Sequence, residues 1–157
     1  MDEKTIWGIH GGKTGDAESL MLQKKVMAIG WKDFGSFSGL ETRDDFKEKY
    51  AEIFPGKSIQ HIATSAGQQF RFVHEVQIGD LVVFPTKRSR QVHIGEITGE
   101  YQYQPGVDAN YPNHRAVQWL KSFPRTSFSQ RSLYEMGAAL SLFQIKKHSD
   151  EIRALLE

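Results

Sequence analysis

Three basic residues, Lys87, Arg88 and Arg90, lie close together in a loop between two apolar runs of the sequence. The loop, residues 86–91, contains no apolar side chain that folding would bury. Clustered lysine and arginine side chains attract anionic partners such as phosphate groups, although they are also common in solvated loops. The loop is therefore a first indication of an anionic partner, with an ordinary exposed loop as the alternative.

A second loop, residues 32–39, keeps aromatic side chains among small and acidic ones. It follows Gly30 and Trp31 and contains Asp33, Phe37 and Ser38. Aromatic residues in an irregular loop either fill a gap in the core or line a pocket. Trp31 and Phe37 are therefore candidates for the wall of a ligand pocket, with packing in the core as the alternative.

Residue types that carry catalysis or bind metals show no recognised spacing. The six histidines follow neither an HxH nor an HExxH pattern, and the absence of cysteine excludes a cysteine-based zinc site. The Gly-Gly-Lys-Thr run at residues 11–14 lacks the GxxxxGK[ST] spacing of a phosphate-binding P-loop. No serine lies in a nucleophile-elbow context. The sequence thus predicts a binding protein, with no catalytic residues, metal or cofactor.

The composition is that of one globular domain. The chain has 157 residues, of which 39% are hydrophobic and 25% charged, and its net charge is +1. So small a net charge means that local basic patches would have to hold any nucleic acid. The lack of cysteine fits a reducing cytoplasm, and the sequence has neither a signal peptide pattern nor an apolar stretch of about 20 residues. We therefore expect a cytoplasmic protein with no membrane partner.

The hydrophobic patterns predict short strands interrupted by helices. Strands are expected at Thr5–His10, Val26–Trp31, Leu81–Phe84, Val92–Thr98 with a continuation over Glu100–Gln104 after a bend at Gly99, His114–Leu120 and Leu140–Ile145. Helices are expected at 17–24 after Asp16, at 43–54 after Thr42, from Ser58 to about Val76, at 130–136 after Ser129, and at 146–157. This order predicts the α+β class, as a small mixed β-barrel of about six strands with peripheral helices and a central hairpin.

Several short motifs, taken together, resemble a known family. The motifs are Trp7-Gly8-Ile9, Ala28–Trp31, Gln68–Glu75, Gly79–Val83, Gly95–Gly99, Tyr101-Gln102-Tyr103 and His114–Leu120. In order and spacing they are similar to the N-terminal domains of Mrr-type modification-dependent restriction proteins. Those domains belong to the EVE-like branch of the PUA superfamily, which also contains the YTH domains. The resemblance covers nearly the whole chain, up to about Ile145.

The resemblance implies a PUA/EVE-like barrel with an aromatic-lined pocket for a modified base. A tryptophan at the end of the second strand helps to form that pocket in the relatives, and Trp31 matches it. The pocket residues so expected are Trp31, Trp7, Gly30, Asp33, Phe37, Ser38, Tyr101 and Tyr103. The basic residues expected to contact the nucleic-acid backbone are Lys87, Arg88, Arg90, Arg71 and Arg115. Strand packing is the alternative role for the tyrosines, and salt bridges are the alternative for the last two arginines. Packing in the core is the alternative for Trp7, and a loop-capping Asx turn is the alternative for Asp33.

The function implied is that of a DNA-binding specificity module in a modification-dependent restriction system. The module would flip a methylated or hydroxymethylated cytosine, or N6-methyladenine, out of double-stranded DNA into the pocket. Residues 1–145 would form this reader domain, and the helix at 146–157 would lead to a fused or associated nuclease. Two alternatives stay open: a YTH-like or PUA-like RNA-binding domain, and a protein- or nucleotide-sensing domain that flips no base.

Overall fold

The computed structural model describes residues 3–157. Its strands are β1 (Ile6–Ile9), β2 (Val26–Ile29), β3 (Leu81–Pro85), β4 (Gln91–Tyr103), β5 (Asn113–Pro124) and β6 (Leu142–Ile145). Its helices are α1 (Glu18–Lys24), α2 (Arg43–Ile53), α3 (Ile59–Phe70), α4 (Gln130–Met136) and α5 (Ser149–Leu156), with a π-helical turn η1 (Arg71–Glu75) and a 3-10 turn η2 (Arg125–Ser127). No helix in this part of the chain is long and apolar enough to cross a membrane.

The six strands form one mixed sheet in the order β2-β5-β4-β3-β1-β6. β1 runs parallel to β3, and the other neighbouring strands are antiparallel. The expected hairpin, β3 and β4, supplies the two central strands. Between residues 3 and 157 the sheet keeps β2 and β6 as edges and does not close on itself. The α+β class is therefore confirmed, whereas closure into a barrel is not.

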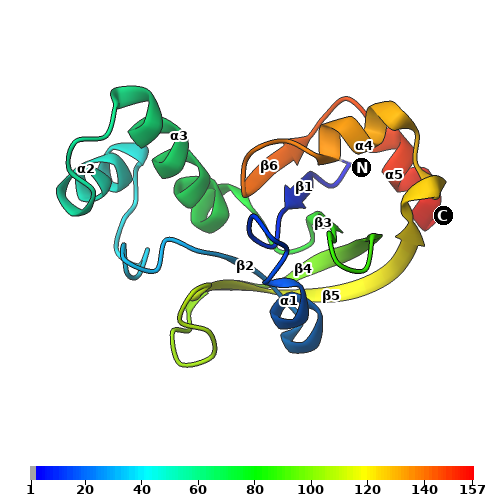
Figure 1. Ribbon diagram of the computed structural model, residues 1–157, viewed down its shortest axis with the longest axis horizontal. Helices are drawn as coiled ribbons and strands as arrows, with labels where there is room; N and C mark the ends of the chain where they lie inside the picture. Colours follow the sequence, from blue (N-terminus) through cyan, green and yellow to red (C-terminus); the bar gives the residue numbers. More distant parts are fainter. Residues whose placement is uncertain (1–2) are drawn as a thin grey trace.

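Helices gather around the sheet in three groups (Figure 1). α2 and α3 pack on each other at one end, α4 and α5 lie with β6 at the other end, and α1 lies beside β2. The core has two parts, and successive side chains of β1 point alternately into one and the other. Trp7 and Ile9 belong to the part that includes α1, α2 and α3, and Ile6 belongs to the part under α4 and α5. Because both faces are covered, all four residues of β1 are buried.

Side-chain caps start three helices at the positions that the sequence predicts. The hydroxyl of Thr42 accepts a hydrogen bond of 3.1 Å from the backbone N–H of Asp45, and Asp45 Oδ2 accepts one of 3.1 Å from the N–H of Thr42. This reciprocal pair is a capping box. The hydroxyls of Ser58 and Ser129 cap α3 and α4 by accepting from His61 and Ser132.

The predicted continuation of the strand past Gly99 is confirmed, because β4 runs through to Tyr103 as one strand. Its pairing with β5 shifts register between Ile97 and Tyr101, the stretch that contains the predicted bend. Gly99 also allows close packing, since a Cβ at this position would lie 2.9 Å from the Cβ of Ala116 on β5. β5 also extends beyond its predicted end, since Pro124 pairs with Gln91.

Three predicted helix positions are also corrected. The helix expected up to Val76 ends at Phe70 and gives way to the π-helical turn η1, whose carbonyl groups are used by a side chain from β5 (below). Asp16 does not cap the first helix, which starts at Glu18 with no side-chain cap, because the Asp16 carboxylate is bonded elsewhere. The last helix starts at Ser149 rather than at residue 146.

Candidate functional site

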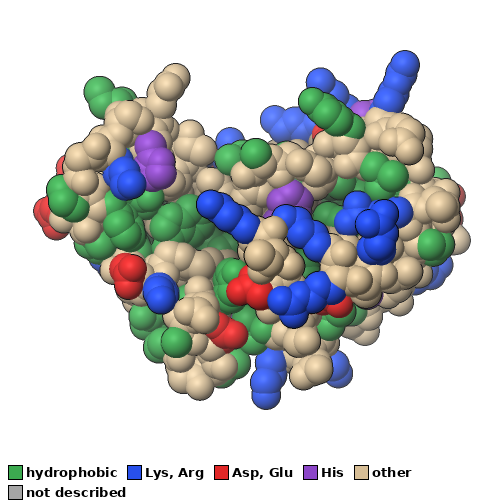
Figure 2. Space-filling model, viewed as in Figure 1, with side chains coloured by type: hydrophobic (Ala, Val, Ile, Leu, Met, Phe, Trp, Pro, Cys, Tyr) green, Lys and Arg blue, Asp and Glu red, His purple; other side chains and the backbone are tan. Residues whose placement is uncertain are grey.

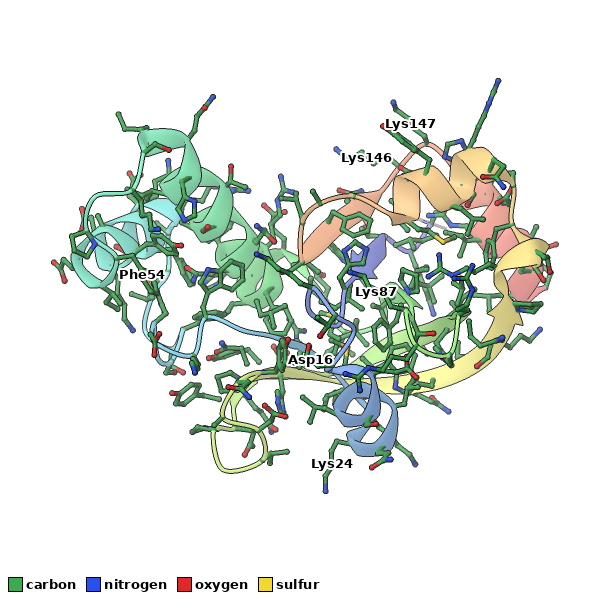
Figure 3. The ribbon with its side chains drawn as sticks, in the orientation of Figure 1. Asp16, Lys24, Phe54, Lys87, Lys146 and Lys147 are labelled. Atoms are coloured by element: carbon green, nitrogen blue, oxygen red, sulfur yellow. The ribbon has the colours of Figure 1, made fainter. Side chains whose placement is uncertain are left out.

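A cavity of about 570 Å³ opens between the end of β2, the loop before β5 and the helices α2 and α3. We call it the aromatic cavity, because four aromatic side chains line it together with two carboxylates: Trp31, Tyr50, Phe54, Tyr111, Asp16 and Asp33. Figure 3 labels Asp16 and Phe54, which reach the cavity from the start of α1 and the end of α2. A concave site with aromatic walls and a few polar groups is the usual form of a small-ligand pocket.

Trp31 forms the wall at the end of β2, on a backbone held in an unusual conformation. Its φ is +56°, in the left-handed region that residues other than glycine rarely adopt. The carbonyl of Gly30 just before it accepts a hydrogen bond of 2.8 Å from the side-chain amide of Asn113, and the carbonyl of Trp31 accepts one of 2.9 Å from Phe34. The half-buried indole is thus presented by a turn that is fixed on both sides.

Tyr101 supports this turn from behind the cavity. Its hydroxyl donates to Asn113 Oδ1 at 2.6 Å and accepts from the backbone N–H of Phe37 at 2.9 Å. Its ring stacks on that of Phe37, with centroids 5.5 Å apart. Burial raises the pKa of the Tyr101 hydroxyl, so it stays protonated and able to donate at neutral pH. Tyr101 and Phe37 therefore position the Asn113 amide that binds Gly30, and they do not line the cavity.

Tyr111 forms a second aromatic wall from the loop between β4 and β5. Its hydroxyl donates to Asp16 Oδ1 at 2.7 Å, which ties this loop to the segment before α1. Its backbone N–H donates to Asp108 Oδ1 at 2.9 Å, and its carbonyl lies 2.7 Å from His114 Nε2. The bond to Asp16 passes directly over Gly12, where a Cβ would lie 2.1 Å from the Tyr111 hydroxyl. A side chain at position 12 would therefore displace Tyr111.

Burial raises the pKa of Tyr111 to about 12, and the neighbouring Asp16 acts in the same direction. Because the folded-state value lies above the ordinary 10.0, the stability from this hydrogen bond is fully present below about pH 10 and is lost as the pH rises toward 12. We expect a titration of tyrosinate absorbance to show one tyrosine ionising near pH 12. That step should be missing from Tyr111→Phe, and an unchanged titration would contradict the assignment.

α2 and α3 supply the third wall. The hydroxyl of Tyr50 lies 2.8 Å from His61 Nε2, and the rings of Tyr50 and Phe54 lie 4.6 Å apart in a tilted arrangement. Tyr50 is buried, whereas Phe54 is half-buried and His61 is exposed. Lys57 lies at the same wall and Lys32 at the opposite one, so the cavity carries two acidic and two basic side chains. Its overall charge is balanced.

The structure brings Gly30, Trp31 and Asp33 together among the predicted pocket residues, and it places the others elsewhere. Trp7 is only 3% exposed, and its indole N–H donates to Asp80 Oδ2 at 3.0 Å. Ser38 and Tyr103 are exposed but do not line the cavity.

The predicted backbone-contacting residues also divide into two groups. Lys87, Arg88 and Arg90 are exposed in the loop between β3 and β4. Lys and Arg side chains gather across the centre and right of the face drawn in Figure 2, the region in which Figure 3 labels Lys87. Arg71 is 3.6 Å from Glu75, one turn along the chain, so its predicted alternative role as an ion-pair partner is observed.

Arg115 is a core residue, with 1% of its surface exposed. Its Nη1 donates to the carbonyls of Phe72 and Val76 at 2.9 and 2.8 Å, and its Nε donates to the carbonyl of Gly99 at 2.7 Å. Burial lowers the pKa of its guanidinium, although the charges of Glu100 and Asp80 act against this. Arg115 therefore joins η1 to β4 and is not presented to a nucleic acid.

Sequence reasoning missed eight residues of the aromatic cavity: Asp16, Lys32, Tyr50, Phe54, Lys57, His61, Asn110 and Tyr111. The spacing of Tyr50 and Phe54 indicates an apolar helix face, and that face packs on the core while its end also reaches the cavity. Tyr111 stands in a loop with no periodic pattern, so only the fold places it opposite Trp31 around the cavity. Between residues 3 and 157, no three His, Asp or Glu side chains come together as a metal ion would require.

The fold and this cavity define an α+β protein with an aromatic-walled cavity. The chain belongs to the family described as a domain of unknown function, DUF8426, whose model matches residues 7–146. That match includes every aromatic residue of the cavity. The chain matches no curated protein.

Proposed function

We propose that this protein is a DNA-binding module that recognises a modified base by flipping it out of the duplex into the aromatic cavity. The observation that carries the proposal is that Trp31 and Tyr111, from segments far apart in the sequence, line one cavity of about 570 Å³. A base held by aromatic faces gains about 1–3 kcal/mol from stacking. A base inside a duplex cannot be enclosed in this way, so the proposal requires its extrusion.

Polar groups of the cavity support a base as the ligand. Asp33 and Asp16 place carboxylate oxygens at the cavity, and carboxylates accept hydrogen bonds from the exocyclic amino group of cytosine. The same chemistry suits the amino group of adenine, including its N6-methylated form. We therefore propose methylated or hydroxymethylated cytosine, or N6-methyladenine, as the ligand.

The resemblance to EVE-like domains of the PUA superfamily supports the same function, and we propose that the open sheet is a variant of that architecture. The proposal makes double-stranded DNA the partner, a fused or associated nuclease the effector, and the cytoplasm the place of action. In this scheme the module selects the site and carries out no chemistry itself. The exposed loop with Lys87, Arg88 and Arg90 would contribute contacts to phosphates that are independent of sequence.

The proposal is tested by fluorescence-polarisation binding to matched DNA duplexes at two salt concentrations. The duplexes carry no modification, 5-methylcytosine, 5-hydroxymethylcytosine or N6-methyladenine, and an RNA of the same sequence with and without N6-methyladenine completes the set. We expect one modified duplex to bind at least about 5-fold more tightly than its unmodified match, as stacking of one base implies. Equal binding to all duplexes would refute the proposal, and a preference confined to modified RNA would replace DNA by RNA as the ligand.

A further inference from the structure

A second cavity, of about 560 Å³, lies beside the aromatic cavity and shares Tyr111 with it. We call it the cationic groove. Its walls come from the loop between β1 and α1, the loop after β3, the turn η2 after β5, and the segment 136–141 between α4 and β6. With the loop that carries Tyr111, five separate parts of the chain therefore build it.

Charge distinguishes the cationic groove from the aromatic cavity. Its charged side chains are Lys13, Lys87 and Arg125, and the described residues that line it include no Asp or Glu. His10 also lies in the wall, where its Nε2 is 2.7 Å from the carbonyl of Met136. Burial lowers the pKa of His10, and the charge of Lys87 acts in the same direction. Three cations are thus left facing a groove with no acidic side chain.

The fold holds two of these cations at the groove without an anionic partner. Arg125 Nη2 donates to the carbonyl of Thr86 at 2.8 Å, and Lys87 Nζ donates to the carbonyl of Lys13. Neither these residues nor Lys13 takes part in an ion pair in the part of the chain that the structure describes. Charged donors that are positioned by neutral carbonyls keep their charge available for an external anion.

We propose that the cationic groove binds the phosphodiester backbone next to the flipped nucleotide, with Lys13, Lys87 and Arg125 as its phosphate contacts. The inference rests on the proposed function, and it assigns a place to the strand that carries the base. Tyr111 lines both cavities, so in this proposal the base lies in one cavity beside it and the adjoining phosphates lie in the other. The loop at residues 11–15 then contributes a lysine side chain, and not the backbone cradle of a P-loop.

The test removes charge from the DNA backbone and from the protein, first separately and then together. In the best duplex of the binding panel, each phosphate flanking the modified base is replaced in turn by an uncharged methylphosphonate. We expect one or two positions to weaken wild-type binding several-fold. The double variant Lys13→Gln/Lys87→Gln should bind the all-phosphate duplex less tightly and lose its sensitivity at those positions. The slope of the logarithm of its binding constant against the logarithm of the salt concentration should become shallower by about 1.8, because each of the two lost phosphate contacts contributes about 0.9.

The matched control is Lys146→Gln/Lys147→Gln, which removes the same charge from exposed residues that do not line the groove, as labelled in Figure 3. The inference is overturned if the groove variant keeps the wild-type methylphosphonate sensitivity, or if the control variant lowers the salt slope equally. It is also overturned, together with the proposed function, if wild-type protein shows no preference for modified DNA. If wild-type protein prefers modified DNA but no methylphosphonate weakens its binding, the groove assignment alone is overturned.

Discussion

Replacing Trp31 with alanine is expected to remove the preference for modified over unmodified DNA. The indole is one of two aromatic walls from outside the helices, and its loss removes a stacking surface worth about 1–3 kcal/mol, or about 5- to 150-fold in affinity. Binding to unmodified duplex should change little, since phosphate contacts supply it. Fluorescence polarisation on the matched duplexes measures both quantities for each variant.

Two further variants separate loss of the ring from damage to the turn. The backbone of Trp31 is left-handed, so Trp31→Gly removes the ring while relieving the strain that alanine retains. It should lose discrimination as Trp31→Ala does. Tyr134→Ala is the matched control, because Tyr134 is an aromatic residue that is 88% exposed and outside the cavity. If both Trp31 variants discriminate like wild type, Trp31 does not contact the base.

Replacing Arg115 with methionine is expected to lower the free energy of unfolding by about 3 kcal/mol or more. The carbonyls of Phe72 and Val76 would lose their donor inside the core, and that of Gly99 would lose it at a partly buried position. A buried polar group left without a partner costs about 1–3 kcal/mol. Methionine retains much of the side-chain length, so the loss reports the hydrogen bonds more than the volume. Urea denaturation followed by tryptophan fluorescence gives the value.

Arg71→Met is the control for that measurement, since it removes the same charge from a half-buried position outside the core. Its pair with Glu75 joins side chains that are each 39% exposed, and such pairs contribute less than about 1 kcal/mol. A similar decrease in the free energy of unfolding in both variants would show that the hydrogen bonds from Arg115 to η1 and β4 contribute no more to stability than the Arg71–Glu75 ion pair does.

Local signals in the sequence were sufficient for most of the secondary structure. A cap such as Thr42 or Ser58 acts on amides two or three residues away, so the residues themselves reveal the start of the helix. The π-helical turn was missed. The carbonyls of Phe72 in this turn and of Val76 just after it accept hydrogen bonds from Arg115 on β5, a distant contact that the local sequence does not reveal. The alternation of side chains along β5 predicts which face of the strand carries Arg115, but it does not predict that this face is buried.

The candidate site was predictable on one side only. Trp31 stands out because an aromatic residue follows Gly30 at the end of an apolar run, and the structure puts both at the cavity. The facing residue, Tyr111, depends on its bond to Asp16, a contact between loops that no periodic pattern encodes. Phe37 and Trp7 carry the same residue types as a pocket wall, yet they are buried in the core, since residue type alone does not fix exposure.

The position of β1 in the sheet has a consequence for how the protein is synthesised. β1 is made first, but its neighbours are β3 and β6: Trp7 pairs with Val82 in the middle of the sequence and with Gln144 near its end. On the ribosome, one edge of this apolar strand stays unpaired until β3 has emerged, and the other stays unpaired until β6 has emerged. Pairings between residues so far apart form slowly, and open strand edges invite association with other chains. We therefore expect nascent chains that lack β6 to expose an unpaired edge of β1 to association with other chains.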